Sequence, residues 1–331
     1  MKSRIGARTA TLGVLSALAV AATGCGGDTS IVRPKGSEAD RISGVWWLMF
    51  GLATAVYVVV AGLIIYSTLR GRRRRRSNLR ENWFIWIGGV VIPALVLLVL
   101  AIVTVDSTAA LREPRRGELR VHVTGKRWWW DVRYPDGNVR TANEIHLPAG
   151  QPVDVVLTSD NVIHSFWVPE LAGKVDTIPG QTNHLRFTAE SPGTYRGVCA
   201  EYCGIQHAHM GFLVIVQSPA GFERWLTRER VLAGEPTTDE EARGQVVFER
   251  NACAGCHTVR GTAAIGKLGP DLTDVGTRRT LGALTIENTR PNLESWIRDA
   301  PALKPGAVMP SFRTLSPDDV SAIAAYLESR R

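Results

Sequence analysis

Two long stretches of this 331-residue chain lack charged residues, from position 42 to 69 and from 83 to 105. A helix needs ~20 apolar residues to span a bilayer, and neighbouring helices can accommodate the kink expected at Pro93. Four tryptophans stand near the ends of the stretches, where aromatic side chains mark membrane interfaces: Trp46, Trp47, Trp83 and Trp86. The pattern predicts a hairpin of two transmembrane helices within residues 41–110, and the hydrophobic content of 45% excludes global disorder.

Acidic residues are absent between positions 70 and 80, where the chain carries a block of arginines: Arg70, Arg72, Arg73, Arg74, Arg75, Arg76 and Arg80. The net charge of +8 invites a nucleic-acid interpretation, but this block and three basic residues near the N-terminus account for all of it. A short connector between two membrane helices offers little accessible surface, so we expect no nucleic-acid partner. Short arginine-rich loops stay in the cytoplasm, and both ends of the hairpin are therefore predicted to face outward.

The N-terminus has the organisation of an export signal. Lys2, Arg4 and Arg8 precede an apolar segment that is too short to span a bilayer. The segment ends in Ala-Thr-Gly-Cys, which resembles a bacterial lipoprotein processing site and predicts a signal peptide over residues 1–24 with lipidation of Cys25. The alternatives are ordinary signal cleavage and retention of the segment as an anchor.

Beyond the hairpin, residues 117–218 alternate short apolar stretches with turns that contain proline, aspartate and glycine. The stretches lie at positions 119–123, 152–157, 184–187 and 212–216. Regular short strands of this kind predict an antiparallel β-sandwich. The chain shows no internal repeat.

The last part, residues 238–331, carries helical signals instead. Thr238 and Glu241 form a capping-box pattern, and Ser316 before Pro317 predicts a second helix start. The apolar residues of that second helix recur on one face: Val320, Ile323, Ala324 and Leu327. An all-α unit is therefore predicted here.

Cysteines are few: there are five, an odd number, and no spacing among them requires a disulfide. Cys253-Ala-Gly-Cys256-His257 is a CxxCH haem-attachment signature, in which the cysteines form thioethers and the histidine binds iron. A zinc site or a redox CxxC is the alternative. Met309 is the only methionine after the motif and no histidine follows His257, so Met309 is the candidate for the sixth iron ligand.

A second ligand cluster lies in the segment Cys-Ala-Glu-Tyr-Cys-Gly-Ile-Gln-His-Ala-His-Met. Cys199, Cys203, His207 and Met210 supply two thiolates, an imidazole and a thioether, a soft set that favours copper over hard cations. Two bridging thiolates can hold two copper ions, and His164 in the predicted sandwich could supply a second imidazole. A zinc site made by both histidines and both cysteines is the main alternative, and a Cys199–Cys203 disulfide is another.

These features together resemble subunit II of cytochrome c oxidase. The loop with both cysteines, the upstream His164, the helix hairpin and the aromatic run Trp128–Tyr134 carry the resemblance. The appended haem unit, with its segment around Met309, resembles the class I cytochromes c fused to subunit II in bacterial caa-type oxidases. The resemblance implies a multidomain membrane protein with a two-helix transmembrane hairpin, an all-β cupredoxin sandwich over 117–218 and an all-α cytochrome c domain over 238–331.

The resemblance also implies a dinuclear copper centre, CuA. Its implied ligands are the thiolates of Cys199 and Cys203, which bridge both coppers, the imidazoles of His164 and His207, the axial thioether of Met210 and the backbone carbonyl of Glu201. The Glu201 side chain would face subunit I, where the family uses it in a magnesium site.

Trp128 matches the aromatic residue through which electrons enter CuA in the family. The alternative is that Trp128 is a core residue with no role in electron transfer. Four basic residues surround Trp128: Lys126, Arg127, Arg133 and Arg140. A docking site for a basic cytochrome c would be acidic instead. This argues against docking of a basic cytochrome c at this face. The family has a glutamate for proton entry at the inner end of the second helix. Glu81 is the candidate for this residue, but its spacing to Pro93 departs from the family's pattern.

The sequence therefore indicates a redox subunit of a terminal oxidase in the bacterial plasma membrane, with the copper and haem units on the outer face. Electrons would come from an upstream cytochrome c or quinol–cytochrome c reductase and pass through haem c and CuA. They would leave to subunit I, which contains haem a and CuB and works with subunit III. The alternatives are a free-standing electron carrier or copper-handling module, a nitrous-oxide reductase, and a quinol-oxidase subunit II, which lacks the cysteine pair.

Overall fold

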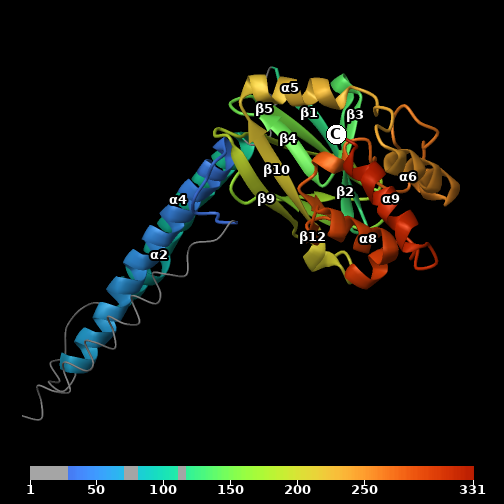
Figure 1. Ribbon diagram of the computed structural model, residues 1–331. Helices are drawn as coiled ribbons and strands as arrows, with labels where there is room; N and C mark the ends of the chain where they lie inside the picture. Colours follow the sequence, from blue (N-terminus) through green and yellow to red (C-terminus); the bar gives the residue numbers. More distant parts are fainter. Residues whose placement is uncertain (1–28, 71–80, 111–116) are drawn as a thin grey trace, which may run out of the picture.

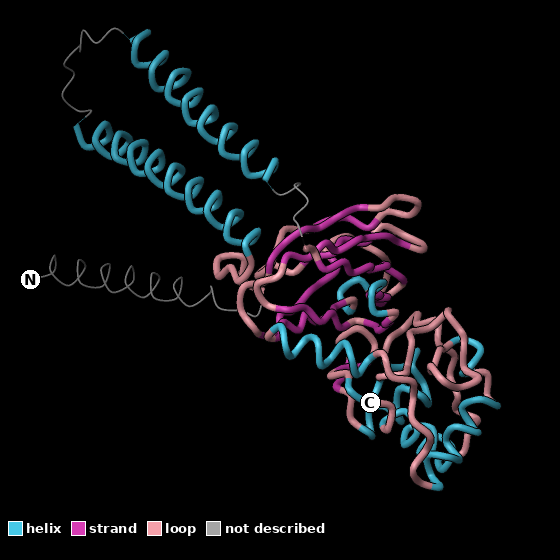
Figure 2. Tube along the Cα trace, turned by 90° about the horizontal axis from the view of Figure 1, so that it is seen from above, coloured by secondary structure: helices cyan, strands magenta, loops and turns pink. Residues whose placement is uncertain are grey.

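The computed structural model of the chain describes residues 29–70, 81–110 and 117–331 (Figure 1). A rod of two helices leads to a β-sandwich, and a helical unit packs against the sandwich (Figures 1 and 2). The predicted signal peptide, Cys25 and the arginines between positions 72 and 80 lie outside the described residues.

The rod consists of α2 (Ser37–Arg70) and a second helix built from α3 (Glu81–Trp86), η1 (Ile87–Val91) and α4 (Ile92–Ala110). The two helices lie side by side, and each is long and apolar enough to cross a membrane, which confirms the two predicted helices. The π-helical turn η1 ends just before Pro93. Proline lacks an amide hydrogen and its ring pushes against the preceding turn, so the helix accommodates it by locally widening its hydrogen-bond pattern.

The start of α2 is anchored to the sandwich by backbone hydrogen bonds. The Lys35 amide donates to the Glu170 carbonyl at 2.7 Å, and the Glu190 amide donates to the Lys35 carbonyl at 3.1 Å. The Ala39 amide reaches the Leu171 carbonyl at 3.3 Å. The hairpin and the sandwich are therefore joined by pairing as well as by chain connection.

The sandwich consists of two five-stranded sheets. One contains, in spatial order, β3 (Val139–Ala142), β2 (Trp129–Tyr134), β1 (Leu119–Lys126), β5 (Pro152–Ser159) and β8 (Asn183–Thr188). The other contains β4 (Glu144–Pro148), β10 (Gly211–Gln217), β9 (Gly193–Cys199), β6 (His164–Trp167) and β7 (Val175–Thr177). The predicted sandwich is confirmed, but it is mixed rather than wholly antiparallel: β1 pairs with β5, and β10 with β4, in parallel. Neither pair is adjacent in sequence, so crossover connections join them.

The core of the sandwich is aromatic. Trp130 is fully buried and packs edge-on against Phe166 and Phe212, which stack on each other. The helix α5 (Pro219–Glu229), which was not among the elements expected from the sequence, adds Phe222 and Trp225 to this core. Burial of such large side chains supplies most of the driving force for the packing of α5 on the sheets.

The helical unit contains α6 (Asp239–Arg250), α7 (Cys253–Cys256), α8 (Arg290–Leu303) and α9 (Pro317–Glu328). Short elements complete the external part: η2 (Pro135–Gly137), η3 (His207–His209), η4 (Val275–Thr277), β11 (Thr280–Leu281) and β12 (Ile286–Glu287). The unit has its own core, to which the four predicted residues of α9 contribute: Val320, Ile323, Ala324 and Leu327.

Both predicted helix caps are present in the helical unit. The Thr238 hydroxyl accepts a hydrogen bond from the Glu241 amide at 3.2 Å, and the Ser316 hydroxyl accepts one from the Asp319 amide at 3.1 Å. The Glu241 carboxylate accepts from the Thr237 amide at 2.8 Å, so the return bond of the capping box forms one residue before the cap.

A buried polar network joins the helical unit to the sandwich. The Thr141 hydroxyl donates to Asp274 at 3.1 Å, and the Arg279 amide donates to the Glu144 carboxylate at 2.7 Å. Asp274 is itself paired with Arg278 at 2.8 Å. Such groups need partners when buried, so the network fixes the relative placement of the two units.

Glu229, at the end of α5, makes this interface sensitive to pH. Burial, together with the adjacent Asp274 carboxylate, raises the pKa of Glu229 to about 8. Between about pH 4.5 and 8, Glu229 is therefore protonated in the folded chain and ionised in the unfolded chain. The free energy of unfolding falls as pH rises through this range, because the unfolded state binds fewer protons. We expect Glu229→Gln to stabilise the chain by roughly 1–3 kcal/mol at pH 9 and to leave it unchanged near pH 4.

Thermal unfolding of the full chain as a function of pH measures this effect. Glu223→Gln, an exposed substitution on the same helix, is the control and should follow the wild-type profile. Identical pH profiles for Glu229→Gln and the wild type would show that folding does not raise the pKa of Glu229.

Candidate metal centres

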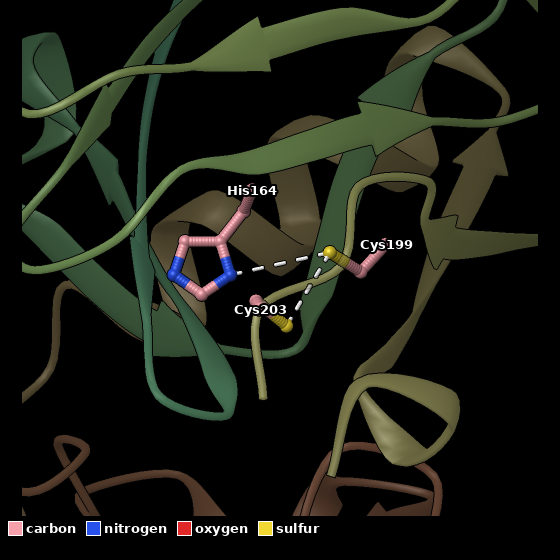
Figure 3. Close-up of side chains that lie close together, drawn as sticks. All are labelled: His164, Cys199 and Cys203. Carbon is pink, nitrogen blue, oxygen red and sulfur yellow. Dashed lines mark hydrogen bonds between the residues drawn. The ribbon is translucent and has the colours of Figure 1, made fainter. Parts of the chain in front are cut away.

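The pairing of β6 with β9 brings the first three predicted copper ligands together. Phe166 lies opposite Cys199 in the register, so His164, at the start of β6, is next to the end of β9. Its Nδ1 lies 4.0 Å from the Cys199 Sγ, which lies 3.8 Å from the Cys203 Sγ (Figure 3). All three residues are buried, and their ligand atoms lie within 4.8 Å of one another.

The loop between β9 and β10 supplies the remaining ligands. Cys203 Sγ lies 3.7 Å from the His207 Nδ1, which is in η3, and 3.8 Å from the Met210 Sδ. The Cys199 thiol approaches the Glu201 carbonyl oxygen at 3.2 Å, whereas the Glu201 side chain is exposed. The structure thus gathers every copper ligand predicted from the sequence, and the distance between the sulfurs is that of two free thiols rather than a disulfide.

The two thiols interact strongly. The hydrogen bond between the two thiols, supported by His164, lowers the pKa of Cys199 and raises the pKa of Cys203. Metal ions bind thiolates, so binding of a metal to this pair would release protons. Two thiolates, two imidazoles and a thioether in a buried pocket fit copper, so the donor set is suited to the predicted centre.

The aromatic run divides between the core and the copper loop. Trp128 is half-buried, and its indole Nε1 donates to the Cys203 carbonyl at 2.9 Å. Trp130 is a core residue, and its Nε1 reaches the Met210 carbonyl at 3.3 Å. Trp128 is therefore in direct hydrogen-bond contact with a predicted copper ligand.

Most of the basic residues near Trp128 have acidic partners. Arg140 and Arg133 both bind Asp131, at 2.7 and 3.2 Å, and Lys126 binds Asp160 at 2.6 Å. Two carboxylates therefore balance only part of the positive charge near the aromatic run, which keeps a basic excess.

The CxxCH motif forms the short helix α7. The His257 Nδ1 makes a hydrogen bond of 2.8 Å with the Pro270 carbonyl, which leaves Nε2 free to bind a metal. Backbone bonds tie the following segment to the motif, from the Gly266 amide to Ala254 at 3.1 Å and from the Gly269 amide to Cys256 at 2.8 Å.

Large apolar side chains near the motif are unusually exposed. Ile265 and Leu268, in the segment bonded to α7, are 75% and 77% exposed, and Val308, next to Met309, is 86% exposed. A bound porphyrin would cover surfaces of this kind, so the residues fit a haem. Met309 is partly buried in the loop after α8.

The other histidines take no part in these clusters. His146 stacks on Trp225, and burial lowers its pKa to about 4. His184 pairs with Asp154 at 2.9 Å. His122 and His209 are exposed.

The residue that sequence reasoning missed is Lys304. It is buried, and its Nζ donates hydrogen bonds to the Trp128 carbonyl, the His209 carbonyl and the Gly282 carbonyl. Its sequence context, before Pro305 and close to Met309, shows only that it belongs to the haem-ligand loop.

Comparisons with known proteins agree with both sites. The family model "Cytochrome C oxidase subunit II, periplasmic domain" matches residues 137–218, and the family model "Cytochrome c" matches residues 241–331. The chain is 35% identical to cytochrome c oxidase subunit 2 of Alkalihalophilus pseudofirmus, over 95% of each chain. It is 30% identical to that of Bacillus subtilis, over 92% of this chain and 93% of the relative. The crystal structure of the periplasmic domain of subunit II of cytochrome oxidase of Bradyrhizobium japonicum is 31% identical, covers 35% of this chain and 96% of its own, and has a TM-score of 0.34.

The chain therefore belongs to the cytochrome c oxidase subunit 2 family, and it carries a C-terminal cytochrome c domain. It is a membrane-bound electron-transfer subunit of a haem-copper terminal oxidase. The subunit II domain implies CuA and the cytochrome domain implies haem.

Gly269 is a sensitive position of the haem site. A Cβ there would lie 2.5 Å from the His257 Cε1, so Gly269→Ala must displace the imidazole. We expect the haem content per chain to fall severalfold, as measured by the haem absorbance of the purified, denatured protein. Gly255→Ala lies within the CxxCH motif but has open space around the new methyl group, and it should keep wild-type haem content. Full haem incorporation in Gly269→Ala would contradict the proposed orientation of His257.

Proposed function

We propose that the chain passes electrons from a covalently bound haem c to a dinuclear CuA centre and on to subunit I, which reduces oxygen to water and translocates protons. The observation that carries the proposal is the direct contact between the two loops that contain the predicted ligands Met309 and Met210. Lys304, in the haem-ligand loop, donates at 2.7 Å to the His209 carbonyl in the copper loop. This contact holds the loop of the predicted haem ligand against the loop of the predicted copper ligands, as a path for electrons between the two sites requires.

In this proposal, the thiolates of Cys199 and Cys203 would hold two copper ions. His164 and His207 would each supply an imidazole, and the Met210 thioether and the Glu201 carbonyl would complete the ligand set. A centre with shared thiolates spreads the change of charge over both ions, and the buried ligands limit rearrangement when an electron arrives. Trp128, bonded to the Cys203 carbonyl, is the point of electron entry.

The haem would be held by two thioethers, each formed by addition of a thiol, Cys253 or Cys256, across one porphyrin vinyl group. His257 and Met309 would supply the nitrogen and sulfur ligands of the iron. The Pro270 carbonyl fixes the ring orientation of His257, and thioether ligation by Met309 favours the ferrous state.

The organisation of the chain supports the remaining assignments. Residues 1–24 form a lipoprotein-type signal, with Cys25 as the lipidated residue, and residues 117–218 and 238–331 form the CuA and cytochrome domains on the outer face of the bacterial plasma membrane. The partners are subunits I and III, with an upstream cytochrome c or quinol–cytochrome c reductase as donor. The Glu201 carboxylate, which is exposed, would contribute to a magnesium site with subunit I.

Metal content tests the two sites together. We expect the purified full chain, matured with copper and haem, to contain two copper ions and one haem. Cys203→Ser removes a bridging thiolate and should abolish the dinuclear copper while the haem remains, whereas Tyr202→Phe in the same loop should keep both metals. A single copper ion or stoichiometric zinc in the wild type would overturn the dinuclear assignment.

Met309→Leu tests the haem ligation. The substitution leaves both cysteines and His257 in place but removes the thioether, so the haem potential should fall. Each ~59 mV lost in a one-electron couple lowers the equilibrium population of reduced haem relative to oxidised haem tenfold. A redox titration measures the shift, with Val308→Ala, an exposed neighbour, as the control. An unchanged spectrum and potential in Met309→Leu would show that Met309 is not a ligand.

A further inference from the structure

Lys304 is a buried cation at the contact between the two metal-site units. It is 4% exposed, and its Nζ lies 2.9 Å from the Trp128 carbonyl, 2.7 Å from the His209 carbonyl and 2.6 Å from the Gly282 carbonyl. An ammonium group has three donors, so all of them are used. Two of the carbonyls belong to the sandwich and one belongs to the helical unit, and a single side chain therefore joins three loops.

A buried lysine at this position lowers the stability of the folded chain. Burial of an ammonium group is unfavourable, and the three hydrogen-bond partners of the Lys304 Nζ are uncharged backbone carbonyls. Burial accordingly lowers the pKa of Lys304 to about 7. A methionine would fill the same volume without this cost, which indicates that the hydrogen bonds of Lys304 do more than fill space.

The helical unit also holds the backbone on the other side of Met210. The Gly211 amide donates to the Ala283 carbonyl at 3.3 Å. Ala283 and Leu284 have φ values of 61° and 65°, a left-handed conformation that costs free energy in residues with a side chain. His209 and Gly211, which flank Met210, are therefore both bonded to the helical unit.

A tight turn connects Lys304 to the haem-ligand side. The Ala307 amide donates to the Lys304 carbonyl at 3.0 Å, with Pro305 and Gly306 between them, and Gly306 has a φ of 85°. Proline followed by a residue with positive φ is the signature of a type II turn. A Cβ on Gly306 would lie 3.1 Å from the Trp128 ring, so the turn packs directly against that indole.

We propose that Lys304 is a positioning residue that couples the loop of Met309 to the loop of Met210, so that docking of the helical unit sets the position of the Met210 thioether beside the cysteine pair. The inference rests on the proposed function for the identity of the bound metals. Lys304 contacts neither metal site directly: it acts through the backbone carbonyls of His209 and Trp128.

Lys304→Met in the full chain tests the coupling, first without copper. The variant keeps the length of the side chain and loses all three hydrogen bonds. We expect amide hydrogen exchange in the peptide 207–213 to become roughly tenfold faster than in the wild type. Thr141→Val is the matched control, because it removes a different hydrogen bond between the units, to Asp274, and it should leave exchange in this peptide unchanged.

The same variants are then loaded with copper and compared by electron paramagnetic resonance. Lys304→Met should alter the copper hyperfine pattern, which reports the ligand geometry, while Thr141→Val should not. If Lys304→Met does not fold, as judged by its haem spectrum, Gly306→Ala displaces the same turn and should alter exchange and hyperfine pattern in the same direction.

The outcomes separate the two proposals. Wild-type exchange and a wild-type hyperfine pattern in Lys304→Met would overturn the positioning role and leave the proposed function intact. A wild-type chain that binds no dinuclear copper would overturn the proposed function, and the exchange measurement on the copper-free chain would still decide whether Lys304 positions the loop.

Discussion

The pairing of β6 with β9 is the constraint on which the copper site depends. His164 and Cys199 are separated by 35 residues in the sequence, and the register that places Phe166 opposite Cys199 brings them to 4.0 Å. A one-residue slip would turn every side chain of β6 to the other face of its sheet. The aromatic core opposes such a slip, because Phe166 of β6 is buried against Trp130 of β2 and Phe212 of β10. The hydrophobic core therefore sets the geometry of the ligands.

The second organising feature is the docked helical unit. Its contacts with the sandwich are largely polar and buried, and they converge on the copper loop through Lys304 and Ala283. The turn at Gly306 lies on Trp128, the residue proposed for electron entry. A face that the chain covers with its own cytochrome domain is a poor site for a soluble donor, which agrees with the basic residues around it. The fused domain thus takes the place that a separate electron donor would occupy.

Much of this could be predicted from the sequence, because the decisive signals are local. The CxxCH motif, the cysteine loop and the uncharged helices each lie within one short segment, and the ligands that the loop predicts do come together. Other features were beyond local patterns. The parallel pairing of β1 with β5 depends on crossover connections. The helix α5, by contrast, begins with Ser218 before Pro219, the same local signal that predicts α9, and could have been predicted. The contact of Lys304 with Trp128 spans 176 positions, and nothing near Lys304 in the sequence indicates its partner.

The central claim is that the two metal sites of this chain act as one path for electrons. The most direct test is flash reduction of the haem in the purified full chain, loaded with both metals, followed by optical detection of haem oxidation and copper reduction. Our account predicts that both signals change with one rate constant that is independent of protein concentration, because the transfer is intramolecular. A rate that rises in proportion to protein concentration, or a haem that stays reduced while the copper stays oxidised, would contradict it.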